Sequence, residues 1–284
     1  MTDGNNNDME SRRQGALAAD RCFTRSRLKD EFRMKPAAGA EPVKWYKGQY
    51  GKKYAVYRIA DCVPMREKRE PTEKQRQAAS QLAQWSRRNS ISGQASARAA
   101  SLLARHPLFL DTETTGLGGN AQAVEIGLVE TTGEVVFETR LRPSVGIEPG
   151  ALAVHGISED VLSDAPAWPD ISAQIQQIIG DRPLVIFNAD YDLRILRQTA
   201  AAYEDPAPWL DCVEAHCAMY LAADYFGATN RYGTISLASA ALYAGVAWPD
   251  RAHAAITDAI VTAGVVGVIA DYYKKLCAVQ NVSG

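Results

Sequence analysis

The chain has 284 residues, of which 46% are hydrophobic, and this is enough apolar material for a substantial core. No apolar run approaches the roughly 18 residues that span a bilayer, and the polar N-terminus lacks the apolar centre of a secretory signal. We therefore expect an intracellular, cytoplasmic protein without a membrane partner. The five cysteines show no paired spacing, which argues against a disulfide framework or a zinc site.

Charge is divided unevenly along the chain. Residues 1–105 carry 22 Lys and Arg against 11 Asp and Glu, whereas residues 106–284 carry 9 against 22. The formal charges are therefore +11 and −13. A basic segment beside an acidic domain indicates a polyanion-binding arm joined to a domain that collects carboxylates, although a solvated, solubilising tail would have the same composition.

The basic part divides into two predicted regions. Residues 1–40 are polar and without a clear period, so we expect disorder or loosely formed helix there. Residues 41–105 are predicted to form an accessory region that begins with a hairpin over Val43–Pro64, where aromatic and basic residues interleave around Gly51. Such rings could stack on bases while the cations meet phosphates, but a small sheet with half of its aromatics buried would have the same sequence.

Two helices complete the accessory region. The capping-box pattern at Pro71–Gln75 predicts a helix through about Arg88. A linker over Asn89–Gly93 then leads to a second short helix over Ala95–Arg105.

An alternation of strands and helices begins at His106, and we assign residues 106–284 to one α/β domain, a mixed sheet led by a hairpin and flanked by helices. The predicted strands are 108–110, 124–129, 135–141, 184–187 and 209–210, and the predicted helices are about 190–203, 212–223, 236–244 and 254–273. Cys212, His216 and Cys217 are expected to be buried in the second of these helices and not to bind zinc.

The strongest local signal is Asp111-Thr112-Glu113-Thr114-Thr115-Gly116, directly after an apolar strand. Alternate residues of a strand face the same side, so Asp111 and Glu113 point together. Two carboxylates on one face repel each other, and a hard divalent cation would supply the missing countercharge. Screening by water at an exposed strand end is the alternative.

Two further acidic positions follow. Asp192 lies in the first turn of a predicted helix after the strand 184–187, from where it can reach the sheet edge at which Asp111 projects. Asp190 is better placed as a helix cap. His253 and Asp258 are five residues apart, so we expect the histidine in the loop before the last helix and the aspartate inside it.

The ordered set Asp111-x-Glu113, Asp192 and His253-x4-Asp258 resembles the three exonuclease motifs of the DnaQ-like DEDDh family, in the RNase H-like superfamily. That family includes polymerase proofreading subunits such as the DNA polymerase III epsilon subunit, RNase T and oligoribonuclease. The resemblance covers about residues 106–273, and Glu125-Ile126-Gly127 and Val154-His155-Gly156 add to it. A minor departure is Phe187, where the family often has histidine.

The resemblance implies a metal-dependent 3′→5′ exonuclease that acts on nucleic acid, with DNA strands as the expected substrate, and that releases nucleoside 5′-monophosphates. Two Mg²⁺ or Mn²⁺ ions would be held by four carboxylates, and His253 would act as the general base. The metal ligands implied are Asp111, Glu113, Asp192 and Asp258. The residues implied at the 3′-terminal nucleotide are Thr114, Leu117, His155 and Asn188, although His155 could equally be an ordinary packed histidine.

Other functions share these motifs. An RNA or oligoribonucleotide 3′ exonuclease uses the same catalytic set, and a non-catalytic nucleic-acid-binding protein could keep the fold. A role in DNA replication or repair would call for a polymerase or repair partner, which we would expect to contact the N-terminal region.

Overall fold

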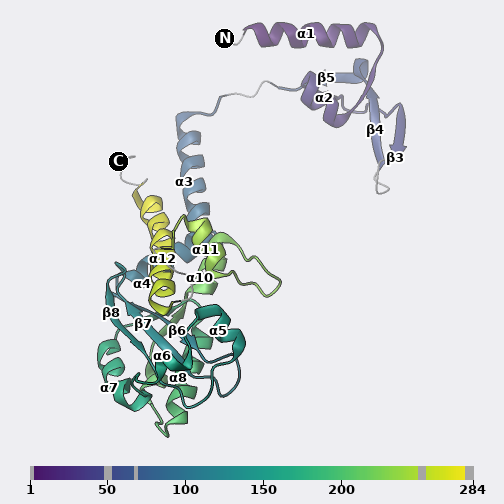
Figure 1. Ribbon diagram of the computed structural model, residues 1–284. Helices are drawn as coiled ribbons and strands as arrows, with labels where there is room; N and C mark the ends of the chain where they lie inside the picture. Colours follow the sequence, from purple (N-terminus) through teal and green to yellow (C-terminus); the bar gives the residue numbers. More distant parts are fainter. Residues whose placement is uncertain (1–2, 48–52, 67–69, 249–253, 279–284) are drawn as a thin grey trace. The chain divides into compact units, whose positions relative to one another are not determined.

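The computed structural model describes residues 3–47, 53–66, 70–248 and 254–278. The chain forms two compact units, Met1–Arg76 and Gln77–Gly284 (Figure 1). This division differs from the expected boundary at residue 105, because the second helix of the expected accessory region packs into the core of the second unit.

The N-terminal unit has secondary structure where disorder or loosely formed helix was expected. Its elements are α1 (Asp3–Ala18), β1 (Cys22–Thr24), α2 (Arg25–Phe32), β2 (Met34–Pro36), β3 (Lys44–Lys47), β4 (Lys53–Arg58), a 3-10 turn η2 (Ile59–Asp61) and β5 (Cys62–Pro64). The strands form one sheet in the order β1-β4-β3 and a second from β2 and β5. Phe23, Leu28 and Phe32 are buried with Tyr57 and Ile59. This arrangement differs from the expected disorder or loose helix. The few apolar residues find their partners far along the chain, and no local period announces such a core.

Two helices follow, α3 (Glu73–Asn89) and α4 (Ile91–Leu103). The predicted capping box is present, because Thr72 Oγ1 accepts from the N–H of Gln75 at 3.3 Å and the Gln75 side chain accepts from the N–H of Thr72 at 2.9 Å. The expected linker over Asn89–Gly93 shrinks to Ser90, whose hydroxyl caps α4 by accepting from the Gly93 N–H at 3.1 Å.

The second unit is built on a five-stranded sheet. Its strands are β6 (Leu108–Thr114), β7 (Ala123–Val129), β8 (Val135–Arg140), β9 (Leu184–Ile186) and β10 (Ala215–Cys217), in the order β10-β9-β6-β7-β8. The first three are antiparallel neighbours, whereas β9 runs parallel to β6 and β10 parallel to β9. The predicted mixed sheet led by a hairpin is confirmed.

The fifth strand lies elsewhere than the sequence pattern predicted. Trp209–Cys212 forms a short helix, α9, and the edge strand is β10, which contains His216 and Cys217. Cys212 is exposed and Cys217 only partly buried, so the expectation of three buried helical residues was wrong. A strand of three residues is too short to show its own periodicity. The apolar residues of β10 and α10 therefore looked like one continuous helix in the sequence.

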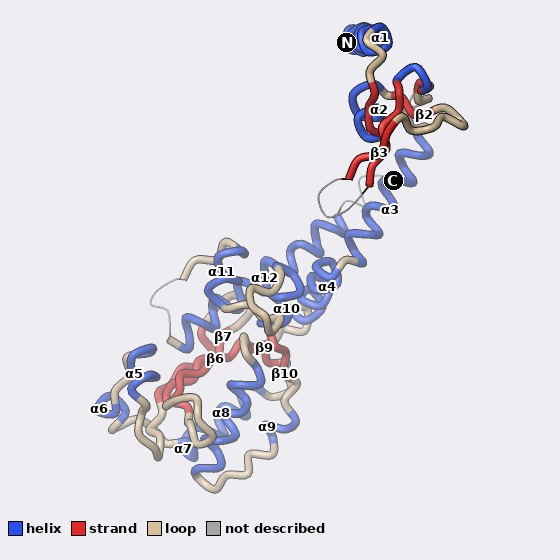
Figure 2. The backbone as a smooth tube through the Cα atoms, turned by 90° about the vertical axis from the view of Figure 1, so that its right-hand side faces the viewer, coloured by secondary structure: helices blue, strands red, loops and turns tan. Residues whose placement is uncertain are grey.

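Helices cover both faces of this sheet, as Figures 1 and 2 show. They are α5 (Pro149–His155), α6 (Glu159–Leu162), α7 (Trp168–Ile179), α8 (Ala189–Ala202), α10 (Ala218–Phe226), α11 (Leu237–Ala244) and α12 (Ala255–Ala278). Alternation along β6 assigns the faces. Phe109 packs in the cluster formed with α4, α10, α11 and α12, whereas Leu108 and Leu110 pack in the cluster formed with α7 and α8.

Helix α12 is the central element of the layer formed by α4, α10, α11 and α12. By length and composition alone it could cross a membrane, but such a helix is weak evidence when it is mostly buried. Its small and β-branched residues, among them Ala259, Val265 and Val266, are fully or almost fully buried. They pack on β6 and β7 and on α4, whose Ala95 and Ala99 are also fully buried.

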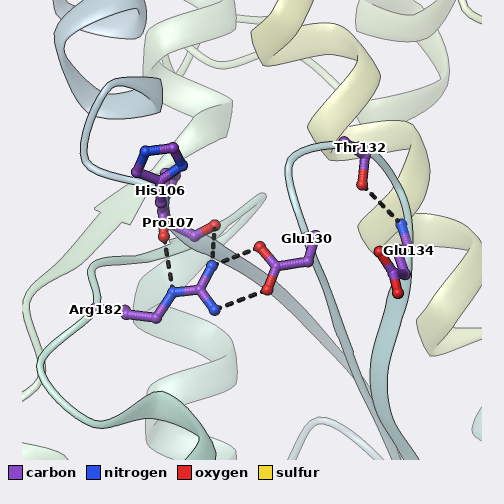
Figure 3. Close-up of polar contacts among 6 residues, drawn as sticks. All are labelled: His106, Pro107, Glu130, Thr132, Glu134 and Arg182. Atoms are coloured by element: carbon purple, nitrogen blue, oxygen red, sulfur yellow. Dashed lines mark hydrogen bonds and ion pairs between the residues drawn. The ribbon is translucent and has the colours of Figure 1, made fainter.

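An arginine joins three chain segments at the edge where β6 and β9 begin. Arg182 donates to both carboxylate oxygens of Glu130, at 2.8 and 2.6 Å, and to the carbonyl oxygen of His106 at 2.8 Å (Figure 3). The paired guanidinium keeps the pKa of the Glu130 carboxyl below its usual value. These contacts stabilise the end of the sheet at which β6 and β9 begin. The acidic residues lie at the opposite end of β6.

Candidate active site

The far end of β6 presents the first two acidic side chains. Asp111 and Glu113 alternate with Thr112, so both project toward the layer that contains α12. Glu113 is 9% exposed and Asp111 is partly exposed. Buried carboxylates on one strand face carry a high electrostatic cost unless a cation or a proton is present.

Helix α12 adds a third carboxylate from its first turn. Ligand oxygens of Asp111, Glu113 and Asp258 all lie within 4.8 Å of one another. Carboxylate oxygens at this spacing are the donor set that hard divalent cations such as Mg²⁺, Mn²⁺ and Ca²⁺ accept. The residues present therefore fit a divalent metal site.

Asp192 comes from α8, on the opposite face of the sheet. It is 4% exposed, and its Oδ1 accepts two hydrogen bonds, from the Thr112 N–H at 3.1 Å and the Thr112 hydroxyl at 2.7 Å. Asp192 is thus fixed beside the strand that carries Asp111 and Glu113, although it is not part of the three-residue cluster. Asp190, two residues earlier, is exposed.

Burial raises the pKa values of three carboxyl groups at the site. Burial raises the pKa of Glu113 from 4.5 to about 8, with further contributions from Asp258, Glu125 and Asp192. Burial, together with the charges of Asp192 and Asp258, raises the pKa of Asp111 well above its usual value. Burial also raises the pKa of Asp192 from 3.8 to about 7, against the opposing effect of its bonds to Thr112. A bound cation would reverse these shifts by favouring the ionised form.

Two residues of β7 fix the start of α12. The carboxylate of Glu125 accepts from the backbone N–H of Ala255 at 3.0 Å and from Nε of Arg140 at 3.3 Å. A Cβ atom added to Gly127 would lie 2.7 Å from the backbone nitrogen of Ile256, so only glycine lets the helix come this close to the strand. The position of Asp258 therefore depends on β7 as well as on its own helix.

The predicted general base, His253, lies outside the described residues, which resume at Ala254. On the other side of that gap, Trp248 is described, and its indole N–H donates to Oδ1 of Asp258 at 3.1 Å. Sequence reasoning did not single out Trp248, because ten residues of chain separate it from its partner and no motif joins them.

The four residues predicted to contact the substrate lie in different settings. Thr114 is buried, and its hydroxyl bonds to the Tyr191 hydroxyl at 2.8 Å, so Tyr191 is a neighbour that sequence reasoning missed. Leu117 is 76% exposed on the loop after β6. Asn188 is exposed at the start of α8, where its carbonyl oxygen accepts from the N–H groups of the helix.

His155 has a defined tautomer. Its Nδ1 accepts from the Ile157 N–H at 2.9 Å, so Nε2 carries the proton and donates to the Thr114 carbonyl oxygen at 3.1 Å. Both ring nitrogens are therefore engaged with the backbone, and the ring is 5% exposed. In this state His155 orders the end of β6 that follows the two acidic residues.

Comparison with known proteins identifies the same region. A family model described as an exonuclease of the RNase T type matches residues 108–266. An uncharacterized exonuclease of Escherichia phage 186 is 36% identical over 181 residues, which cover 62% of this chain and 93% of the phage protein. An uncharacterized protein of Salmonella typhimurium is 58% identical over 126 residues, or 44% of this chain and 91% of that protein.

Two further similarities are to a DNA polymerase III subunit and to a solved exonuclease structure. The DNA polymerase III epsilon subunit of Buchnera aphidicola is 36% identical over 102 residues, which are 32% of this chain and 43% of that subunit, so the match spans less than half of its length. Among solved structures, exonuclease X bound to 5′-overhanging duplex DNA is 26% identical and has a TM-score of 0.46, with 59% of this chain and 92% of that chain covered. On the family model and the phage relative, the chain belongs to the RNase T exonuclease family and is a nuclease that hydrolyses nucleic acids.

Proposed function

We propose that this exonuclease removes nucleotides from the 3′ ends of nucleic acid strands, with DNA as the main substrate, and releases nucleoside 5′-monophosphates. The observation that carries the proposal is the cluster of Asp111, Glu113 and Asp258, whose ligand oxygens lie within 4.8 Å of one another. Asp192, held beside β6 by Thr112, is the fourth carboxylate of the proposed site.

The four carboxylates would hold two divalent cations, Mg²⁺ or Mn²⁺. When bound, the ions would supply the charge that stabilises the attacking and leaving oxygens of an in-line displacement at phosphorus. His253 accepts the proton of the attacking water, since an imidazole with the ordinary pKa of roughly 6.5 is mostly neutral at physiological pH. The P–O3′ bond breaks, and the released 3′-oxygen takes up a proton from solvent.

The proposed substrate contacts are the residues that the family resemblance implies, and they differ in exposure. Leu117 is 76% exposed on the loop after β6, and its apolar side chain would wedge against the terminal bases. Asn188 is exposed at the start of α8. Thr114 and His155, both buried, would contribute by shaping the loop between them, because the His155 ring holds the Thr114 carbonyl oxygen.

A DNA substrate is favoured by the epsilon-subunit relatives, which are components of DNA polymerase III by name. By the same analogy we propose a cytoplasmic role in DNA replication or repair. A polymerase or repair partner would bind through the N-terminal unit, which lies outside the region matched by the family model.

The test is release of mononucleotides from 3′-labelled and 5′-labelled DNA and RNA strands with Mg²⁺, Mn²⁺ or EDTA. Metal-dependent shortening from the 3′ end, faster on DNA than on RNA, is expected. A faster rate on RNA would reassign the substrate, and no hydrolysis of any strand with either metal would leave the non-catalytic binding protein as the better description.

Matched variants distinguish the loss of a site carboxylate from the loss of any negative charge on the same helix. Asp192→Asn and Asp258→Asn should reduce the rate by about 10²-fold or more, as expected when a metal ligand or the residue that supports it is removed. Asp190→Asn and Asp271→Asn change exposed acids on the same two helices and should leave the rate within about twofold. Equal losses in both pairs would contradict the assignment.

A further inference from the structure

The N-terminal unit carries a strand that contributes nothing to its core. All four side chains of β3, Lys44–Lys47, are exposed, and Trp45 is 60% exposed. In β4, by contrast, Tyr57 is 3% exposed and packs with Phe23. An exposed edge strand with an uncovered indole is costly in water unless the surface has a partner.

A hollow forms beside the indole. Trp45 lies directly opposite Ala55 on β4, and this small side chain leaves the ring of Trp45 uncovered. Trp45, Lys53 and Arg25 are among the residues that line a shallow hollow of about 610 Å³. The Arg25 guanidinium lies 5.2 Å from the centre of the Tyr57 ring at its base. The hollow combines one large aromatic face with two cations.

Like charges are paired next to it. Lys47 and Lys53 lie directly opposite each other in the antiparallel ladder, an arrangement that is destabilising without a countercharge. Within the part of the chain that the structure describes, neither lysine makes an ion pair with a carboxylate. β3 and β4 contain no acidic residue, and residues 1–76 carry 18 Lys and Arg against 11 Asp and Glu. This surface is therefore suited to an anionic ligand.

We infer that the Trp45 face of the β3–β4 hairpin binds single-stranded nucleic acid, with a base stacked on the indole and phosphates at Lys47 and Lys53. Aromatic stacking needs an unstacked base, which a single strand offers and an intact duplex does not. An apolar protein partner would not need the opposed lysines. On the other face, the rings of Tyr46 and Tyr54 stack on each other with their centres 5.7 Å apart, and the Lys44 ammonium lies over the Tyr46 ring. These two rings therefore offer less free aromatic surface to a base than Trp45 does.

This surface belongs to a different unit from the acidic site, so the inference concerns binding and does not depend on the proposed 3′ specificity. It adds a second contact to a nucleic acid that the exonuclease domain also binds. Two contacts on one strand raise the apparent affinity through effective concentration, without any change in the chemistry at the 3′ end.

The experiment measures binding of the full chain to a fluorescein-labelled oligothymidylate by fluorescence anisotropy. EDTA is present throughout, so that no strand is hydrolysed and failure of the proposed reaction cannot affect the result. Each variant is measured across a salt series, and its thermal unfolding is recorded beside that of the wild type.

Trp45→Ala should weaken binding by about fivefold or more while the dependence on salt keeps its slope, because stacking releases no counterions. The control is Trp85→Ala, which removes an indole of similar exposure, 63%, from α3. Trp85→Ala should bind like the wild type. Equal weakening by the two substitutions, or none by Trp45→Ala, would overturn the inference.

The double variant Lys47→Gln/Lys53→Gln should lower the slope of log K against log salt by about 1.4, because each phosphate that is no longer neutralised reduces the slope by roughly 0.7. Lys29→Gln/Lys35→Gln removes the same charge from exposed positions of the same unit. An equal change of slope in this control would mean that net charge, and not the hairpin, governs binding. Undiminished binding of both Trp45→Ala and the Lys47/Lys53 variant would point to a protein ligand for this face and overturn the proposal.

Discussion

The carboxylate of Glu125 on β7 accepts a hydrogen bond from the N–H of Ala255, the first residue of α12, at 3.0 Å. One residue of the sheet thus holds the helix that carries Asp258. Glu125→Ala should lower the free energy of unfolding by about 1–3 kcal/mol, since it leaves a buried N–H without an acceptor. The rate of hydrolysis should fall by about tenfold as Asp258 loses its fixed position.

Glu125→Gln keeps an oxygen that can accept from the same N–H, so it should recover most of the stability and much of the rate. Denaturant unfolding and initial rates on labelled strands measure both effects. If the Gln variant were as slow as the Ala variant while fully stable, the charge of Glu125, and not its hydrogen bond, would be what the reaction needs.

The indole of Trp248 reports on the proposed metal ligand Asp258, to which it donates at 3.1 Å. A cation that engages this carboxylate changes the charge and geometry of the acceptor. Titration with Mg²⁺ or Mn²⁺ should therefore change tryptophan emission in the wild type and not in Trp248→Phe. Mg²⁺ is the cleaner probe, because Mn²⁺ is paramagnetic. A signal that survives in Trp248→Phe would come from one of the other four tryptophans.

Stability of the metal-free chain should depend on pH through Glu113. Its folded-state pKa is about 8 and its usual value is 4.5, so folding favours the protonated form. The stabilising contribution of that proton is fully present below about 4.5 and is lost as the pH rises through about 8. Thermal unfolding in EDTA should show a falling midpoint across this range.

Two comparisons check the origin of that fall. Glu113→Gln cannot ionise and should flatten the dependence, and saturating Mg²⁺ should do the same in the wild type by binding the ionised form. An unchanged slope in Glu113→Gln would assign the effect to other groups.

The boundary between the units predicts how truncation acts. A chain that begins at residue 77 keeps α4, whereas one that begins at residue 106 removes Ala95, Ala99 and Leu102, which pack in the same cluster as α12. We expect the longer fragment to unfold near the temperature of the second unit in the full chain. The free energy of unfolding of the shorter fragment should be lower by at least about 2–5 kcal/mol, the usual effect of deleting one large buried side chain. Calorimetry of both fragments distinguishes these outcomes.

The catalytic half of the fold was largely predictable because its signals are local. The apolar strand before Asp111, the alternation that puts Asp111 and Glu113 on one side, and the position of Asp258 inside the last helix all follow from period and spacing. The structure brings these three carboxylates together. Their order along the chain was sufficient to indicate the family.

The remainder depends on contacts between distant segments. Glu125 belongs to the Glu125-Ile126-Gly127 segment that adds to the family resemblance, but its bond to Ala255 spans 130 positions and has no sequence pattern. The core around Leu28 and Tyr57 is assembled from short strands whose partners cannot be read from periodicity. The placement of α4 against α12 follows from complementary small side chains, which appear in the sequence only as an alanine-rich helix.

The dependence of the acidic cluster on α12 also orders events during synthesis. Asp111, Glu113 and Asp192 emerge from the ribosome well before the helix that contains Asp258. The cluster is complete only when that helix has packed against the backbone of Gly127. A nascent chain that has reached only β10 holds at most three of the four carboxylates. On the proposed mechanism, we therefore expect a nascent chain to hydrolyse no nucleic acid until α12 has folded onto the sheet.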